Sequence, residues 1–278
     1  MDVRVILQGG LGNQLFQLLS ALALAGTGNR VVVDTVLLQR PSRRLARSSV
    51  TPRAFECERL VAALGWRVRR NRTVPPEAYH RIANLLAVRA PSLRLGPLAL
   101  VTGAGIRTYR ASGADAVLGA HIRRLYRLPA EPVERQSVHV RLGDYRSLEH
   151  VYGPPDARYY RDAMDAAFVA GQPVAVFSDD LPEALAWLQE RFPGFRFRSA
   201  ASFDWPPVPS SGSWTDLLRM AVSRRLVVAN STYSWWSAWL AWQCYARSGL
   251  AHVAPASMHP TGLPAPVGAK GLPWSWDG

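Results

Sequence analysis

Residues 3–14 read VRVILQGGLGNQ, and this stretch decides the fold class of the first half of the chain. The apolar run at 3–7 predicts a buried strand, and the glycines after it predict a tight turn. Apolar residues then recur at helical spacing over 13–25, and a second strand is expected at 31–33, ending at Asp34. A strand, a glycine turn, a helix and a strand in this order open a parallel α/β unit.

A second α/β unit is predicted in the other half, where apolar runs of strand length alternate with helical patterns. Ser213 and Asp216 resemble a capping box and predict the start of one of these helices. Strands are expected at 137–142, 173–177, 195–198, 226–229 and 251–254, and helices at 156–170, 181–192, 213–225 and 231–245.

The boundary between the two units is less clear, because residues 35–135 show no regular pattern. It is placed near Pro129–Pro132, which predicts an N-terminal unit at 1–130 and a C-terminal unit at 131–278. The chain has 278 residues and is 48% hydrophobic, enough to bury a core and to exclude a disordered protein. Its two cysteines exclude a cystine-rich module, and no apolar run reaches the roughly 18 residues of a membrane span, so a cytoplasmic protein is expected.

The charge is unevenly distributed along the chain. The net charge is +13, with +14 in residues 1–130 and −1 in 131–278, and ten arginines lie in Arg40–Arg72. One hypothesis is that this surface contacts an anionic glycolipid or the inner membrane surface. The alternative is a coding bias toward arginine, because Lys270 is the single lysine. A nucleic-acid-binding protein is disfavoured, since no nucleic-acid module accompanies the charge.

The glycine turn carries the first candidate site. Gly10, Gly12, Asn13 and Gln14 precede or open a helix, where the backbone can approach a ligand and the helix N-terminus favours an anion. A plain structural turn and a dinucleotide site, with Asp34 as the ribose ligand, are the alternatives. The dinucleotide reading is weaker because Leu15 stands where a third glycine is needed.

The second candidate site is the stretch VHVRLGDY at 138–145. Strand alternation places its valines and leucine on one face, which should be core, and His139 and Arg141 on the other. Arg141 lies at the C-terminal end of the strand, where open α/β sheets bind ligands, and could hold a pyrophosphate. The alternative is a structural ion pair between Arg141 and Asp144.

The third candidate site is the FSDD run at 177–180, directly after a strand. Asp179 or Asp180 could accept hydrogen bonds from a guanine or a ribose. The alternative is that one of them caps the following helix.

The fourth candidate site is the segment NSTYSWWSAW at 230–239, where a strand end passes into a helix. The hydroxyl-bearing start of this helix suits a phosphate. The candidate residues are Ser231, Thr232, Tyr233 and Ser234. Three tryptophans at helical spacing, Trp235, Trp239 and Trp242, are expected to be core.

These four motifs, in this order, resemble the α-1,2-fucosyltransferase family, glycosyltransferase family 11. The resemblance covers roughly residues 3–34 and 136–260 and is poor in between. It implies a GT-B fold, in which two Rossmann-like units face each other across a cleft. Two departures are Leu142, where the family has a second arginine, and Ser237, where it usually has glycine. Leu142 is expected on the core face, and little effect is expected from Ser237.

The resemblance also implies an activity. The donor would be GDP-β-L-fucose, the acceptor a galactoside-type oligosaccharide or glycolipid, and the reaction an inversion that needs no metal or other cofactor. The C-terminal unit would hold GDP through Arg141 and His139, Asp179 or Asp180, and Ser231 to Ser234, while Gly10 to Gln14 close over the donor.

The reaction needs a stabilised leaving group and, at most, a weak base. Arg141 is expected to stabilise the departing diphosphate, and Asp144 is the leading candidate for the base, with His139 and Glu149 behind it. A related fucosyltransferase of α-1,6 linkage is the second enzyme hypothesis.

Overall fold

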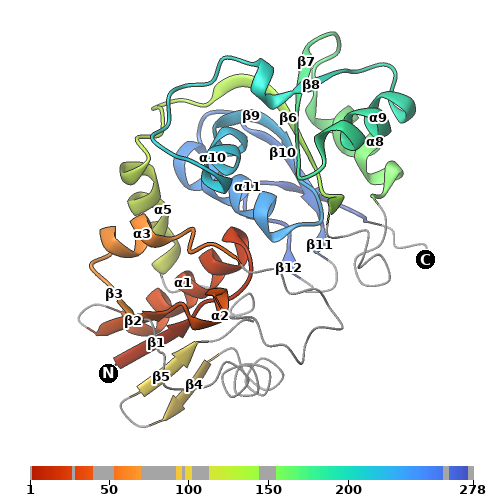
Figure 1. The fold of residues 1–278 in the computed structure, drawn as a ribbon. Coiled ribbons are helices and arrows are strands. Elements are labelled where there is room, and N and C mark those ends of the chain that lie inside the picture. Colours follow the sequence, from red (N-terminus) through yellow and green to blue (C-terminus); the bar gives the residue numbers. More distant parts are fainter. Residues whose placement is uncertain are drawn as a thin grey trace, which may run out of the picture. The chain divides into compact units, whose positions relative to one another are not determined.

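The computed structural model describes residues 2–26, 29–39, 53–69, 92–95, 98–101, 113–143, 155–258 and 263–274. The chain divides into two compact units, Met1–Leu125 and Tyr126–Gly278 (Figure 1). Each unit contains its own largely parallel sheet with helices, so the predicted α/β class is confirmed.

Unit 1 is built on a five-stranded sheet in the order β3-β2-β1-β5-β4, parallel except for the β4–β5 pair. The predicted strand, glycine turn, helix and strand are present as β1, α1 and β2. The elements are β1 (Asp2–Ile6), α1 (Leu11–Ala25), β2 (Arg30–Asp34), α2 (Val36–Gln39), α3 (Glu58–Ala63), β3 (Arg67–Arg69), β4 (Ser92–Leu95), β5 (Leu98–Val101) and α5 (Ala114–Leu125).

Unit 2 is built on a six-stranded, fully parallel sheet in the order β8-β7-β6-β9-β10-β13. Its elements are β6 (Val133–Val140), α8 (Ala157–Ala167), β7 (Pro173–Ser178), α9 (Leu181–Arg191), β8 (Arg196–Ser199), α10 (Ser213–Val222), β9 (Ser223–Val227), α11 (Thr232–Tyr245), β10 (Ala251–Pro255) and β13 (Lys270–Leu272). A short antiparallel pair, β11 (Ser257–Met258) and β12 (Leu263–Pro264), precedes the last strand.

The strand order of unit 2 is that of a Rossmann-type sheet. From β6 the chain moves outward through β7 to β8, then returns to the other side of β6 as β9 and continues to β10 and β13. The point where the direction reverses, between β6 and β9, is where such sheets leave a crevice at the carboxyl ends of their strands. The topology therefore marks the end of β6 as the place to look for a ligand site.

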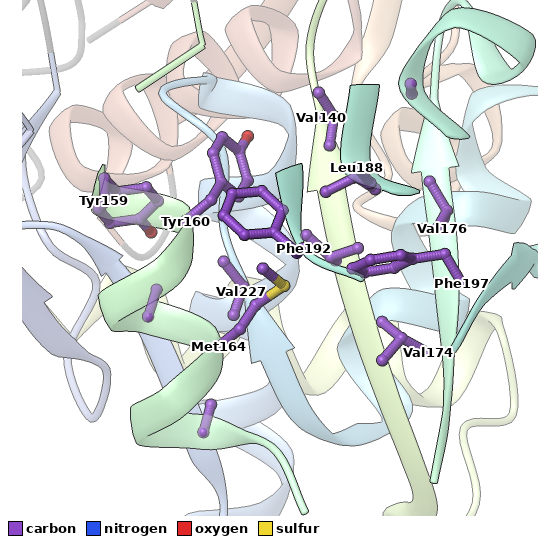
Figure 2. Packing of buried hydrophobic residues seen from close by; sticks show 14 of the residues in the cluster. Val140, Tyr159, Tyr160, Met164, Val174, Val176, Leu188, Phe192, Phe197 and Val227 are labelled. Atoms are coloured by element: carbon purple, nitrogen blue, oxygen red, sulfur yellow. The ribbon is translucent and has the colours of Figure 1, made fainter. Parts of the chain in front are cut away.

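One face of this sheet is covered by α8 and α9, as Figure 2 shows for the buried cluster there. Val138, Val140 and Leu142 belong to this cluster, so the predicted core face of β6 is confirmed, Leu142 included. The other members include Tyr160 and Met164 from α8 and Leu188 from α9. The alternate residues of β6, such as His139, consequently point to the other face of the sheet, where α11 lies.

Some sequence expectations need correction. The N-cap of α10 is Gly212, in a left-handed conformation with φ 57° and no side-chain cap, so the capping box at Ser213 and Asp216 is wrong. The same helix ends at Val222 instead of Arg225, because residues 223–227 pair with β6 and β10 as β9.

The tryptophans of α11 are core residues, as predicted for Trp235 and Trp239, which are at most 1% exposed. Trp236 is equally buried, and Trp242 is half-buried. Gly268 lies against Trp242: a Cβ on this glycine would come within 2.0 Å of the indole ring. The C-terminal segment therefore covers α11, which the sequence pattern did not reveal.

Among the described residues, none of the helices has both the length and the apolar character to cross a membrane.

The contact between Gly268 and Trp242 gives a stability prediction with a built-in control. Gly268 and Gly171 both have positive φ, 83° and 78°, but a Cβ on Gly171 meets nothing within 4 Å. Gly171→Ala should therefore cost only the left-handed strain, about 1–2 kcal/mol. Gly268→Ala should cost about 1–3 kcal/mol more, because the methyl group displaces the indole. Urea unfolding of both variants measures the difference, and equal losses would contradict the packing of Gly268 on Trp242.

Candidate ligand site at the switch point of unit 2

Three strand ends meet at the switch point. β6 pairs with β7 on one side, with Val140 opposite Ser178, and with β9 on the other, with Val138 opposite Val227. Because all three strands are parallel, the residues that follow them emerge at the same edge of the sheet. Three of the four predicted motifs follow these strands, so the fold brings together residues that are up to 95 positions apart.

Arg141 and Asp179 form an ion pair across this edge, with 3.2 Å between Nη1 and Oδ2. Their side chains are 23% and 24% exposed, so the pair is shielded but reachable from solvent. Arg141 was expected to pair with Asp144 if its role were structural. Asp144 lies outside the described residues, and the pair found is with Asp179.

Asp179 also holds the backbone that follows β6. Its Oδ1 accepts a hydrogen bond from the Leu142 N–H at 3.0 Å. Burial alone would raise the pKa of Asp179, but the N–H groups of Leu142 and Gly143 and the Arg141 guanidinium outweigh burial, and the pKa is lowered. The carboxylate is therefore charged at neutral pH and fixes both the turn and the arginine.

Gly143 is required by this arrangement. A Cβ at this position would lie 2.1 Å from the Asp179 Oδ2 atom, far inside contact distance. Any side chain here would push the carboxylate away from the turn and from Arg141. The glycine of the 138–145 motif is thus explained by the close approach of Asp179, which local sequence spacing cannot reveal.

His139 joins β6 to α11. Its Nδ1 lies 2.9 Å from the Ser234 Oγ, and its ring lies 5.8 Å from the Tyr233 ring, centroid to centroid. His139 is 3% exposed, and Ser234 is fully buried. This hydrogen bond fixes the first turn of α11 against the end of β6.

The protonation state of His139 follows from its surroundings. Burial, and then the nearby Arg141 charge, lower the pKa of His139 from 6.5 to about 3, although Asp179 opposes this. The imidazole is therefore neutral at physiological pH. A neutral imidazole can position Ser234, but with this pKa it is a poor acceptor for a substrate proton.

The start of α11 provides the positive end of a helix dipole at the same edge. Its N-cap is Ser231, whose Oγ accepts from the Tyr233 N–H at 3.3 Å, and its first turn contains no acidic residue. By contrast, α8 begins at an acidic N-cap, Asp156, whose carboxylate accepts two backbone N–H groups. The start of α11 thus has no carboxylate of its own to balance the dipole, and it favours an anionic ligand.

The predicted ligand-contact residues of α11 differ in how exposed their hydroxyl groups are and in which hydrogen bonds these groups already make. The hydroxyls of Ser231 and Ser234 are buried and engaged within the chain, as cap and as partner of His139. The Tyr233 hydroxyl donates to the Ser213 carbonyl at the start of α10. Thr232 is half-exposed in the first turn. Asp180 is the N-cap residue of α9 by position, without a side-chain cap hydrogen bond.

In unit 1, the glycine turn is held by glutamine side chains. Gln14 is fully buried, its Nε2 donates to the carbonyls of Gly9 and Ala54, and its Oε1 accepts from the Glu56 N–H. The amide of Gln14 is therefore used inside the chain. Gly10 and Asn13 are half-exposed, and Gly12 is buried.

Asp34 cannot act as the ribose ligand of a dinucleotide site. It is fully buried and ion-paired with Arg4, and its Oδ1 accepts from the Val36 N–H at 3.0 Å. Both carboxylate oxygens are thus engaged inside unit 1, which removes the dinucleotide alternative.

Two buried tyrosines that the sequence analysis did not identify hold the backbone at the ends of β6 and β9 through hydrogen bonds. The Tyr160 hydroxyl donates to the His139 carbonyl at 2.8 Å, and the Tyr159 hydroxyl donates to the Val228 carbonyl at 2.6 Å. Both come from α8 and anchor the ends of β6 and β9. Their helical spacing predicts only a buried face, so their polar role needs the structure.

Within the parts of the chain that the structure describes, no group of three or more His, Cys, Asp or Glu side chains is placed to hold a metal ion. The expected independence from metal stays a prediction. Glu149, like Asp144, lies outside the described residues.

Comparison with known proteins agrees with the motif analysis. Residues 120–245 match Glycosyl transferase family 11, the family that the four motifs resemble, and this match supports the assignment. A 118-residue stretch is 30% identical to the O-antigen biosynthesis glycosyltransferase WbnK of Escherichia coli. That stretch is 40% of this chain and 35% of WbnK, so the match spans about a third of the relative's length.

The buried histidine predicts a pH dependence of stability. Because the folded-state pKa of His139 is lowered to about 3, the unfolded chain binds the proton first as the pH falls below 6.5. Stability is thus fully present above the unfolded pKa and decreases toward pH 3. Between pH 7.5 and 5.5 the loss from this one group is about 1.4 kcal/mol.

His139→Asn should abolish that share of the loss, whereas His121→Asn, at a half-exposed histidine of unit 1, should not. Urea unfolding at the two pH values measures the difference. A wild-type pH dependence that His139→Asn leaves unchanged would show that His139 is not buried in neutral form.

Proposed function

We propose, on the premise that residues 120–245 belong to Glycosyl transferase family 11, that this chain is an inverting glycosyltransferase. It moves L-fucose from GDP-β-L-fucose to the 2-hydroxyl of a galactoside, giving an α-1,2 linkage. The observation that carries the proposal is that Arg141 and the start of α11, whose first turn has no acidic residue, lie at the same edge of the unit 2 sheet.

The departing group in such a transfer is a nucleoside diphosphate, whose negative charge grows as the sugar bond breaks. Preorganised donors aimed at that charge lower the barrier most effectively in a shielded site. Arg141 is held in one direction by Asp179, and the first turn of α11 is held by His139. Both therefore supply fixed positive potential without reorganisation during the reaction.

We assign guanosine recognition to Asp180 in preference to Asp179. The Asp179 carboxylate already accepts from the Leu142 N–H and pairs with Arg141, so a guanine would have to displace these partners. Asp180 follows directly, as the N-cap residue of α9. The preference therefore rests on the contacts that already engage Asp179.

A group other than His139 must take the proton from the acceptor hydroxyl. With a pKa of about 3, the imidazole binds a proton too weakly to be the base at neutral pH. Asp144 therefore remains the proposed base, three residues beyond Arg141 in the sequence. The turn with Gly10, Gly12, Asn13 and Gln14 is proposed to close over the donor from unit 1, with Gln14 acting through the backbone that it holds.

The direct test is an assay of the purified chain with GDP-fucose and a panel of galactosides, reading the linkage in the product. Arg141→Ala should lower kcat by about 10²–10³, the usual loss for one such donor. Arg158→Ala removes the same charge from an exposed position on α8 and should retain activity. No transfer from GDP-fucose to any galactoside, or near-normal turnover by Arg141→Ala, would contradict the proposal; an α-1,6 product would support the second enzyme hypothesis.

The division of roles between the two aspartates gives a separate prediction. Asp179→Asn keeps an acceptor for the Leu142 N–H but loses the charge that holds Arg141, so kcat should fall by about 10-fold to 10²-fold. Asp180→Asn should instead raise KM for GDP-fucose and leave kcat nearly unchanged. Steady-state kinetics of both variants separate the two effects, and a reversed pattern would exchange the two roles.

A further inference from the structure

Unit 1 contains a cavity that the proposed reaction does not use. It has a volume of about 440 Å³ and lies between the end of α1, the end of α3, the start of β3 and α5. Its polar lining consists of Asn29, Arg30, Arg67 and His121, with Trp66 and Val117 among the apolar groups. This volume is within the range of small-ligand sites.

The cavity lies at the edge of the sheet opposite the glycine turn. Arg30 begins β2 and Arg67 begins β3, so both stand at the amino ends of parallel strands. Gly9 and Gly10 instead follow the carboxyl end of β1. Since ligands of the reaction are expected at carboxyl ends, this cavity is a separate site within unit 1.

The charges around the cavity favour an anion. None of the residues that line it is acidic, and Asp2, which is next to Arg30, is ion-paired with that arginine. Arg124 follows His121 on the same face of α5, because Val117, His121 and Arg124 are spaced by four and three residues. Guanidinium groups such as that of Arg67 bind phosphate through two parallel N–H donors.

The rim of the cavity includes an exposed apolar side chain. Val117, which lines the cavity, is 46% exposed. It is one of four large apolar side chains that are exposed among the described residues. A dissolved phosphate would gain nothing from this valine, whereas the interface of a bilayer would bury it beside the lining Trp66.

A coding bias toward arginine does not explain the charge. Such a bias accounts for arginine in place of lysine in both halves, but it does not remove carboxylates. Residues 1–130 contain 6 acidic residues and residues 131–278 contain 14. Of the six acidic residues in 1–130, Asp2 is ion-paired with Arg30 and Asp34 with Arg4.

We propose that this cavity binds the phosphate of an anionic lipid headgroup and that unit 1 thereby docks on an anionic bilayer surface. Arg67 and His121 contact the phosphate, and Trp66 and Val117 enter the interface. The proposal concerns unit 1 alone and does not depend on the proposed glycosyl transfer.

Co-sedimentation of the full chain with vesicles tests this. Binding should require phosphatidylglycerol in a phosphatidylcholine vesicle and should weaken at high salt, since the attraction is screened. Arg67→Gln should reduce binding about fivefold, the value of one basic residue near such a surface. Val117→Asp should reduce it about tenfold by adding a charge to the apolar rim.

Two matched variants in unit 2 serve as controls. Arg198→Gln removes an exposed arginine from the edge strand β8, as Arg67→Gln does from the edge strand β3. Val267→Asp places a carboxylate at a valine that is 55% exposed. Both should bind vesicles like the wild type, and thermal unfolding should show that all four variants remain folded.

Equal binding to vesicles with and without phosphatidylglycerol would overturn the proposal, as would equal losses in Arg67→Gln and Arg198→Gln. A thermal-shift titration with glycerol 3-phosphate distinguishes the source of the phosphate. Stabilisation by glycerol 3-phosphate that Arg67→Gln removes, without any vesicle binding, would place a soluble phosphate in the cavity and overturn the lipid assignment.

Discussion

The site in unit 2 depends on one topological constraint, the reversal of strand order at β6. Because the chain builds β7 and β8 on one side of β6 and β9, β10 and β13 on the other, the loops after β6 and β9 leave in opposite directions. The gap that results is bridged by the hydrogen bond between His139 and Ser234. This single bond joins residues 95 positions apart, and it fixes α11, which follows β9, against β6 in the middle of the sheet.

Electrostatics at this edge follow from the same reversal. Burial keeps His139 neutral, so the positive charge at the site comes from Arg141 and from the dipole of α11. Asp179 offsets only part of the Arg141 charge, because its carboxylate also accepts hydrogen bonds from the backbone N–H groups of Leu142 and Gly143. One carboxylate thus satisfies a turn and orients a cation, which a surface ion pair would not do.

The sequence alone predicted the elements that are defined by short-range patterns. The opening strand–turn–helix, the core face of β6 with Leu142, and the buried tryptophans of α11 all follow from spacing. It failed where the deciding contact is distant: Gly143 is explained only by Asp179, and β13 is a strand only because β10 lies beside it. The capping box failed because Gly212, in a left-handed conformation, replaces a side-chain cap.

The two proposed anion sites rely on different physical means. Unit 2 is nearly neutral in sum, and its proposed site relies on a few groups that burial and hydrogen bonds hold in place, such as Arg141. Unit 1 has an excess of arginine over carboxylate, and its exposed edge strand β3 places Arg67 and Arg69 on one face. A field of this kind discriminates poorly between individual anions, but it is suited to a surface where many anions lie side by side. A few fixed groups suit a single diphosphate, and a charged face suits an anionic surface, so the two proposals do not require the same site to bind both ligands.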